Sequence, residues 1–131
     1  MSLLKSDSLP ATHLPGGAHA RCFRSGEATV VELHGEIDLF SAAAISAELD
    51  GATEPYAPQV LVDLRPVTFI DTSGLDVLHR AHARVRSRAG LLRLVVEKPH
   101  VRRLLRLAAP GLLPLTVTVD DLSAAGRRGR G

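Results

Sequence analysis

Residues 59–96, QVLVDLRPVTFIDTSGLDVLHRAHARVRSRAGLLRLVV, decide the fold. Gln59–Leu64 and Leu91–Val96 both place aliphatic side chains at every second position, which is the period of a β-strand. Between them, Ser73–Arg88 carries apolar residues at helical spacing and ends at Gly90. A helix between two strands suits a crossover connection, which pairs the strands in parallel. This segment therefore predicts part of an α/β fold.

Shorter segments on both sides add strands to the predicted sheet. Arg21–Arg24 and Thr29–His34 are extended runs around Ser25-Gly26-Glu27, whose composition predicts a tight turn and an antiparallel pair. A last extended run covers Leu115–Val119. The later strands are separated by helices and the first two are not, so the sheet is expected to be mixed and mainly parallel.

Two further helices are predicted from the same patterns. The first covers Ser41–Asp50, with Ser41 as its N-cap and Gly51 as its stop. The second runs from Pro99 to Pro110-Gly111, because proline suits a first helical turn and the Pro-Gly pair ends a helix. We expect these helices to pack mainly on one face of the sheet.

The chain is long enough for one domain. It has 131 residues and a mass of 14.0 kDa, which suits a single hydrophobic core and a sheet of about five strands. Asp63 and Arg93 stand mid-strand opposite the aliphatic face, so that second face is expected to be partly open. The domain is predicted over residues 21–120, between a flexible extension at 1–20 and a flexible basic tail at 121–131.

Composition excludes several classes of function. The chain has three Phe, one Tyr and no Trp, too few for aromatic platforms that stack on single-stranded nucleic acid. Cys22 is the only cysteine, so there is no internal disulfide or multi-cysteine metal site. No apolar run reaches the roughly 20 residues that span a bilayer, and the first residues lack a signal-peptide pattern. We expect a cytoplasmic protein that does not bind membranes.

The net charge of +2 conceals a strong segregation of charge. Glu27–Asp63 holds eight acidic residues and no Lys or Arg, whereas Arg80–Arg106 holds nine basic residues and one acidic residue, Glu97. We interpret this pattern as a polarised protein surface. The alternative is nucleic-acid binding, since seven arginines would offer phosphate contacts, but no recognised base-reading motif accompanies them. Those arginines are Arg80, Arg84, Arg86, Arg88, Arg102, Arg103 and Arg106.

The densest polar signal lies in Phe69–Leu75, where a strand passes into a helix. Asp71 is followed by two hydroxyl residues, Thr72 and Ser73, and by Gly74. The unpaired N–H groups and the dipole of a helix start favour negative charge, so a phosphate can be held or attached there. Alternatively, Thr72 or Ser73 only caps the helix and Gly74 only permits close packing.

A second polar turn, His34–Asp38, also leaves a strand and enters a helix. If the two strands are neighbours, both turns share one edge of the sheet, where such folds place their ligands. Alternatively, Gly35 only forms a turn, and Glu36 and Asp38 are only solvated.

Together these motifs resemble the STAS domain family, specifically its stand-alone anti-sigma factor antagonists. Leu33-His34-Gly35-Glu36-Ile37-Asp38 is similar to the family's Gly-Glu-(Leu/Ile)-Asp turn. Asp71-Thr72-Ser73-Gly74-Leu75 is similar to its Asp-Ser-(Ser/Thr)-Gly-Leu phosphorylation motif. Pro99-His100-Val101-Arg102-Arg103-Leu104 is similar to the start of its last main helix. The resemblance covers about residues 20–120 and agrees with the order of predicted elements.

The resemblance implies a phosphoprotein that regulates transcription by partner switching. In its unphosphorylated state it would bind an anti-sigma factor that is also a serine/threonine protein kinase, releasing a sigma factor. Phosphorylation would then separate the two proteins. Carried over by position, the acceptor is Thr72, where the family more often has Ser, with Ser73 as the fallback. The residues implied in partner binding are Gly35, Glu36, Asp38, Asp71, Ser73, Gly74 and Leu75.

Other classes of function have less support in the sequence. His79 and His82 have the spacing of two metal ligands, with Asp76 one turn away, but nothing completes a set, so no metal is expected. No His is placed by sequence to serve as base for Thr72, and no glycine-rich phosphate loop is present, so we expect neither an enzyme nor a cofactor. The alternative to an anti-sigma factor antagonist, which we expect to be a monomer or weak dimer, is a STAS scaffold subunit of a larger signalling assembly.

Overall fold

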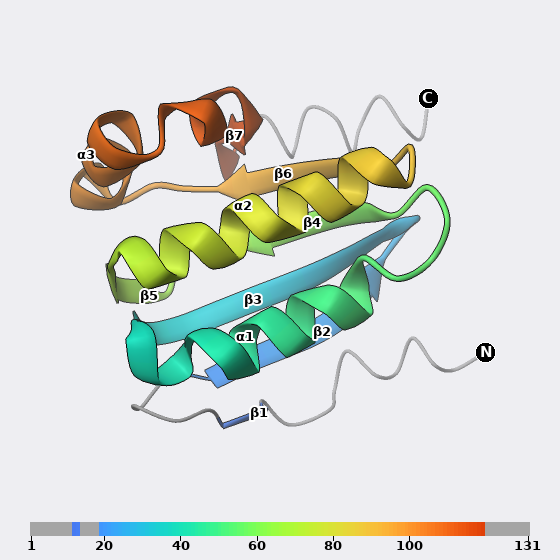
Figure 1. The fold of residues 1–131 in the computed structure, drawn as a ribbon, viewed down its shortest axis with the longest axis horizontal. Helices are drawn as coiled ribbons and strands as arrows, with labels where there is room; N and C mark the ends of the chain where they lie inside the picture. Colours follow the sequence, from blue (N-terminus) through green and yellow to red (C-terminus); the bar gives the residue numbers. More distant parts are fainter. Residues whose placement is uncertain (1–11, 14–18, 120–131) are drawn as a thin grey trace.

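The computed structural model describes residues 12–13 and 19–119 (Figure 1). Their elements in chain order are β1 (Thr12–His13), β2 (His19–Ser25), β3 (Ala28–Ile37), α1 (Leu39–Ala52), β4 (Gln59–Asp63), β5 (Val67–Ile70), α2 (Thr72–Ser87), β6 (Leu91–Val95), α3 (Pro99–Ala108), the 3-10 helix η3 (Pro110–Leu115) and β7 (Thr116–Val117). The strand and helix order predicted from the sequence is confirmed.

The strands form one mixed sheet. Its order is β1-β2-β3-β4-β6-β7, and β5 pairs with β3 beside β4. The pairs β1–β2 and β2–β3 are antiparallel, and every other pair is parallel, as the crossover helices predicted. The described residues hold seven strands rather than about five, because two short strands, β1 and β5, are present beside the five extended runs that the sequence predicted.

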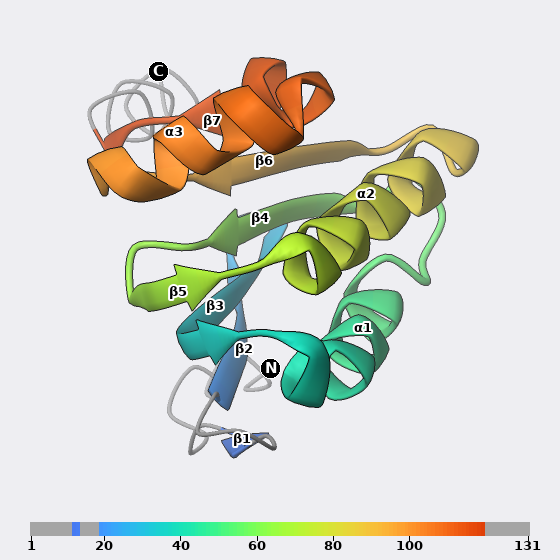
Figure 2. The same cartoon turned by 60° about the vertical axis from the view of Figure 1, so that its left-hand side comes forward.

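Of the described helices, α1 and α2 lie side by side along one face of the sheet, and α3 follows the end of β6 (Figure 2). The core is aliphatic and forms between that face and the helices. Leu33, Val62 and Leu94 of the sheet are almost fully buried, as are Ile45 of α1 and Leu78 of α2. The predicted placement of helices on one face is therefore confirmed. Within the described residues, no helix is both long enough and apolar enough to cross a membrane.

The opposite face is less open at Asp63 than predicted. Only 4% of Asp63 is exposed, because Arg65 folds over its carboxylate. Nε of Arg65 donates to Oδ1 at 2.9 Å, Nη2 donates to Oδ2 at 2.7 Å, and the Arg65 amide donates to Oδ1 at 3.0 Å. Arg93 is half-buried. The sequence placed both residues on the correct face, but it did not reveal the partner two residues after Asp63.

The Asp63–Arg65 pair should make stability depend on pH. Burial alone would raise the pKa of Asp63, but the hydrogen bonds from Arg65 outweigh burial and lower that pKa below its usual value. The stabilisation is therefore present above about pH 4 and is lost as the pH falls through the lower folded pKa. We expect the free energy of unfolding, measured with urea, to fall more between about pH 5 and 3 in the wild type than in Asp63→Asn. Equal slopes would contradict this role.

Several predicted boundaries differ from the structure. β2 begins at His19, and Ala20 is fully buried, so the fold starts inside the expected N-terminal extension. β7 covers only Thr116–Val117 of the expected strand, because Pro110–Leu115 forms a 3-10 helix before it. Apart from β1, His19 and Ala20, the expected extension lies outside the described residues, as does the tail at 121–131.

Candidate functional site

β3 and β5 end side by side, and each is followed by an aspartate and a helix. Ile37 and Ile70 are paired residues of the two parallel strands. The amide of Asp71 donates to the carbonyl of Ile37 at 3.1 Å. Asp38 and Asp71 thus follow neighbouring strand ends, which confirms that the two polar turns share one edge of the sheet (Figure 2).

Asp38 is the N-cap of α1. Its carboxylate accepts hydrogen bonds from the amides of Phe40 at 3.0 Å and Ser41 at 3.2 Å. In return, Oγ of Ser41 accepts from the Asp38 amide at 3.1 Å, which completes a capping box. The predicted N-cap, Ser41, is therefore wrong, because the helix begins earlier with an exposed turn. The predicted stop at Gly51 is also wrong, since α1 ends at Ala52 with Thr53 as its C-cap.

Asp71 has the same role at the start of α2. Its carboxylate accepts from the amides of Ser73 at 2.9 Å and Gly74 at 3.2 Å. The alternative in which Thr72 or Ser73 caps this helix is therefore wrong. Thr72 is exposed and Ser73 is half-buried, and the hydroxyl of neither residue forms a hydrogen bond within the described part of the chain. Because Asp71 supplies the cap, both hydroxyls are left free for another use.

Asp71 can be tested with two substitutions that separate its cap from its charge. Asparagine is as good an N-cap as aspartate, whereas alanine is a poor one. We expect Asp71→Ala to lower the free energy of unfolding by about 1 kcal/mol and Asp71→Asn by much less. Urea unfolding of the two variants beside the wild type measures this difference. An equal loss of stability in both variants would contradict capping as the role of Asp71.

Beneath the two turns, Gly74 and Leu75 are buried. A Cβ on Gly74 would lie 2.6 Å from Cγ1 of Ile70, 2.9 Å from Cγ2 of Ile37 and 3.0 Å from the Ile37 carbonyl oxygen. The alternative in which Gly74 permits close packing is therefore correct. Because Gly74 and Leu75 are buried, they contribute to the packing beneath the site and not to its surface. Gly35 has a φ of +86°, a conformation that favours glycine, where β3 passes from β4 to β5.

Exposed apolar side chains surround the polar turns. Leu39 is 72% exposed, Phe40 is 76% exposed and Phe69 is 48% exposed. Glu36 is also exposed, and Asp38 and Asp71 are half-buried. The polar motifs in the sequence did not identify these three apolar residues as part of the site, although large apolar residues directly beside the polar turns were a usable signal. A shallow hollow of about 320 Å³ adjoins them, lined by Leu39, Ala42, Ala43, Ser46, Ser73, Asp76, Val77 and Arg80. This edge therefore offers a mixed acidic and apolar surface around Thr72.

Comparison with known proteins identifies the fold family. The family model described as "Mlab, STAS domain" matches residues 21–111. The chain belongs to the STAS domain family. This match confirms the family indicated by the motifs and includes both polar turns. The comparison with curated proteins finds no match.

Solved structures resemble this STAS domain over most of its length. An anti-sigma factor antagonist from Mycobacterium paratuberculosis is 26% identical, with a TM-score of 0.73, and the match covers 88% of this chain and 98% of that chain. The anti-sigma factor antagonist SpoIIAA in its unphosphorylated form is 21% identical, with a TM-score of 0.63 and coverages of 86% and 98%. The Bacillus cell fate determinant SpoIIAA in the phosphorylated form is 20% identical, with a TM-score of 0.63 and coverages of 82% and 97%.

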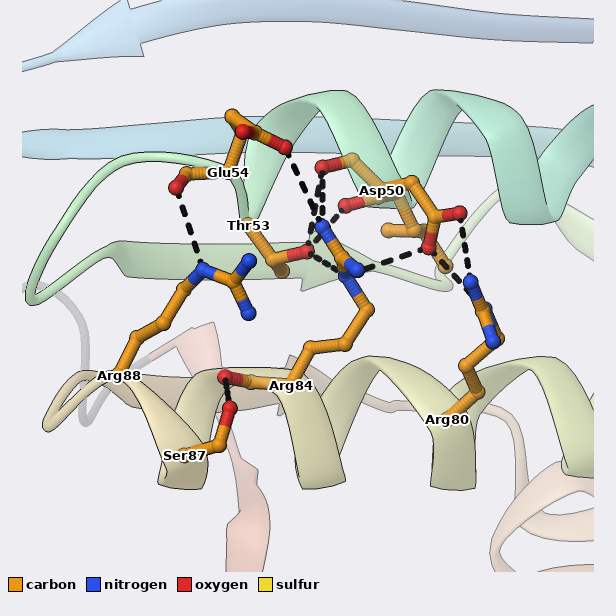
Figure 3. A network of polar contacts seen from close by, with 8 residues as sticks. Asp50, Thr53, Glu54, Arg80, Arg84, Ser87 and Arg88 are labelled. Carbon is orange, nitrogen blue, oxygen red and sulfur yellow. Dashed lines mark hydrogen bonds and ion pairs between the residues drawn. The ribbon is translucent and has the colours of Figure 1, made fainter.

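Several of the segregated basic residues bind acidic or polar groups within the STAS domain, where α2 lies beside α1 (Figure 3). Arg80 donates to both carboxylate oxygens of Asp50, at 3.1 and 2.9 Å. Arg84 donates to Oγ1 of Thr53 at 2.9 Å and to the Asp50 carbonyl at 3.2 Å. Arg88 donates to the Glu54 carbonyl at 3.2 Å. The hydrogen bond from Arg80 lowers the pKa of Asp50. Three of the seven arginines thus bind α1 or the residues directly after it, and only the other four can contribute to a polarised surface.

Three of the four remaining arginines lie on α3. Arg103 and Arg106 are exposed, and Arg102 is half-buried. On α2, burial lowers the pKa of His82, with a further contribution from Arg86. Within the described residues, no group of three or more His, Cys, Asp or Glu side chains is arranged to hold a metal ion.

Proposed function

We propose that this STAS domain is an anti-sigma factor antagonist. In its unphosphorylated state it binds an anti-sigma factor that is also a serine/threonine protein kinase, and a sigma factor is released. Phosphorylation of Thr72 switches it off, with Ser73 as the fallback acceptor. The protein is itself no enzyme, takes no cofactor and works in the bacterial cytoplasm.

The observation that carries this proposal is the free, exposed hydroxyl of Thr72 beside a capping aspartate. Thr72 occupies the first position of α2, and Asp71 satisfies the helix amides in its place. The similar proteins support the same reading, because two are described as anti-sigma factor antagonists and SpoIIAA is described in both phosphorylated and unphosphorylated forms.

The exposed edge of the sheet gives the kinase two kinds of contact. Leu39, Phe40 and Phe69 offer apolar surface that is removed from water on binding. Glu36 and Asp38 offer negative charge to basic groups of the kinase. Thr72 lies on the same edge, so the acceptor hydroxyl sits within the docked surface.

Phosphorylation makes this surface unfavourable for binding the kinase. The terminal phosphoryl group of ATP is transferred to Oγ1 of Thr72, ADP leaves, and the hydroxyl proton passes to a base of the kinase. The product carries about −1.5 to −2 extra charges beside Asp71 and Asp38. A partner fitted to a neutral hydroxyl is then repelled by charge and volume. The N-terminus of α2 stabilises the phosphate internally, so binding is lost while the fold is kept.

Mass spectrometry tests the assignment of the acceptor. The wild type, Thr72→Ala and Ser73→Ala are each incubated with magnesium ATP and candidate anti-sigma factor kinases from the same genome. We expect one phosphate on the wild type and on Ser73→Ala, located at Thr72, and none on Thr72→Ala. Phosphate on Ser73 alone would move the acceptor by one residue. Phosphate found only elsewhere would reject the proposed switch.

Salt should weaken the encounter with the kinase. The two polar turns carry Glu36, Asp38 and Asp71, and Asp76 follows them in α2. Helix α3 carries Arg102, Arg103 and Arg106, so charge of opposite sign lies on different parts of the surface. Charge complementarity mainly speeds association and is screened by salt. We expect the association rate constant, measured by stopped flow, to fall severalfold between about 0.05 and 0.5 M NaCl. A rate constant that does not change would exclude electrostatic steering.

A further inference from the structure

The strand that leads into Thr72 is supported by the sheet on one side only. β5 has four residues and pairs with β3 alone among the described strands, so within this part of the chain its other edge has no neighbouring strand. On the β3 side, the Gly35 amide donates to the Pro66 carbonyl at 3.2 Å and the Asp71 amide donates to the Ile37 carbonyl at 3.1 Å. So short a strand needs support on its outer edge to hold a fixed position.

Lys98 supplies that support from the segment between β6 and α3. Its Nζ donates to the carbonyl of Arg65 at 2.6 Å and to the carbonyl of Val67 at 2.9 Å. Arg65 lies in the connection before β5, and Val67 is the first residue of β5. Lys98 is half-buried, so this charged donor is partly shielded from water. Hydrogen bonds from charged donors are stronger than those between neutral groups.

His100 adds a third contact at an irregular point of β5. The pairing with β3 shifts between Gly35 and Glu36, which are opposite Val67 and Phe69, so Thr68 is an extra residue. Nε2 of His100 lies 3.3 Å from the Thr68 carbonyl. Because a carbonyl only accepts, Nε2 carries the hydrogen in this contact. The start of α3 therefore binds three carbonyls along the outer edge of β5 and the turn before it.

We propose that Lys98, assisted by His100, is a positioning residue for the phospho-acceptor turn. It takes the place of the missing neighbour strand, holds β5 against β3, and so fixes Asp71 and Thr72 beside Asp38. We call the contacts of Lys98 and His100 with the carbonyls of Arg65, Val67 and Thr68 the Lys98 tie. The role of this tie in phosphorylation rests on the proposed function, whereas its effect on β5 does not. Lys98 touches neither Thr72 nor the capping carboxylate and acts through the backbone of β5.

Amide hydrogen exchange measured by NMR tests this tie without any partner. The variants are Lys98→Met, which keeps the aliphatic stem, Lys98→Arg, which keeps a charged donor, and Arg103→Met, which removes an exposed charge from the same helix. We expect the amides of Gly35 and Asp71 to exchange about tenfold faster or more in Lys98→Met, relative to the amides of β4. Lys98→Arg should restore most of the protection, and Arg103→Met should match the wild type. Unchanged exchange at Gly35 and Asp71, or a uniform change at all amides, would overturn the proposal.

A kinetic measurement tests the link to the acceptor, with the kinase that modifies the wild type. When β5 detaches, only a fraction of molecules presents a competent docking surface, so the apparent affinity falls by that fraction. We expect KM for phosphorylation of Lys98→Met to rise severalfold with kcat within about twofold, and Lys98→Arg to rescue KM. An unchanged KM would overturn the link to phosphorylation. If no kinase modifies Thr72 in the wild type, the proposed function fails, and the exchange experiment still decides the role of Lys98.

Discussion

Replacement of Thr72 by glutamate is expected to weaken binding of the anti-sigma factor kinase by about 100-fold or more. The added carboxylate would lie at the first position of α2, beside the carboxylates of Asp71 and Asp38, in the middle of the proposed docking surface. Like charges brought together at an interface cost several kcal/mol, and each 1.4 kcal/mol is a factor of ten in the dissociation constant. Thr72→Ala should bind within about threefold of the wild type, because it adds neither charge nor volume.

A matched control separates local charge from net charge. Ala83 is exposed on the same helix, and 11 positions along α2 correspond to roughly 16 Å, which exceeds the screening length in physiological salt. Ala83→Glu adds the same charge and should leave kinase binding almost unchanged. Isothermal titration calorimetry without ATP measures the dissociation constants of all variants. Equal weakening by Thr72→Glu and Ala83→Glu would show that the effect comes from net charge, and equal binding by all forms would reject the switch.

The sequence predicted most helices and strands because apolar periodicity is a property of each segment alone. It also predicted that the two polar turns share one edge of the sheet, because each turn follows a strand end. It failed at the helix starts, where Ser41 and the Thr72-Ser73 pair were interpreted as possible caps. The apolar period marks only the buried face of a helix. In α1 the first two residues, Leu39 and Phe40, are exposed, and in α2 the buried residues begin only at Gly74 and Leu75. The true caps, Asp38 and Asp71, therefore lie before the point where the period becomes visible.

The charge pattern failed as a predictor for a different reason. Counting acidic and basic residues along the chain reveals segregation but not which groups meet in space. Arg80 and Asp50 are 30 residues apart in the sequence, so their pairing depends on how α1 and α2 pack together. Arg65, by contrast, lies two residues from Asp63, so this ion pair could have been predicted from the sequence. Long-range pairs of this kind require the packed structure.

Gly74→Ala should destabilise the fold by about 1–3 kcal/mol, the usual cost of overpacking a core. The new Cβ would lie 2.6 Å from Cγ1 of Ile70 and 3.0 Å from the Ile37 carbonyl oxygen. The Ile70 side chain can move slightly, but the Ile37 oxygen belongs to the backbone that also accepts from the Asp71 amide. The start of α2 must therefore shift away from the strand ends, and Thr72 moves with it.

Gly51→Ala is the matched control for this substitution. Gly51 lies in the last turn of α1, and nothing lies within 4 Å of a Cβ built there. Alanine costs less than glycine in a helix, so Gly51→Ala should stabilise the fold by about 0.5–1 kcal/mol. Urea unfolding measures both variants, and phosphorylation is assayed under conditions in which both are fully folded. A loss of phosphorylation in folded Gly74→Ala but not in Gly51→Ala would show that close packing beneath α2 positions Thr72. Stabilisation by both substitutions would mean that the strand ends yield to the added methyl group, and that Gly74 is not required for the position of the site.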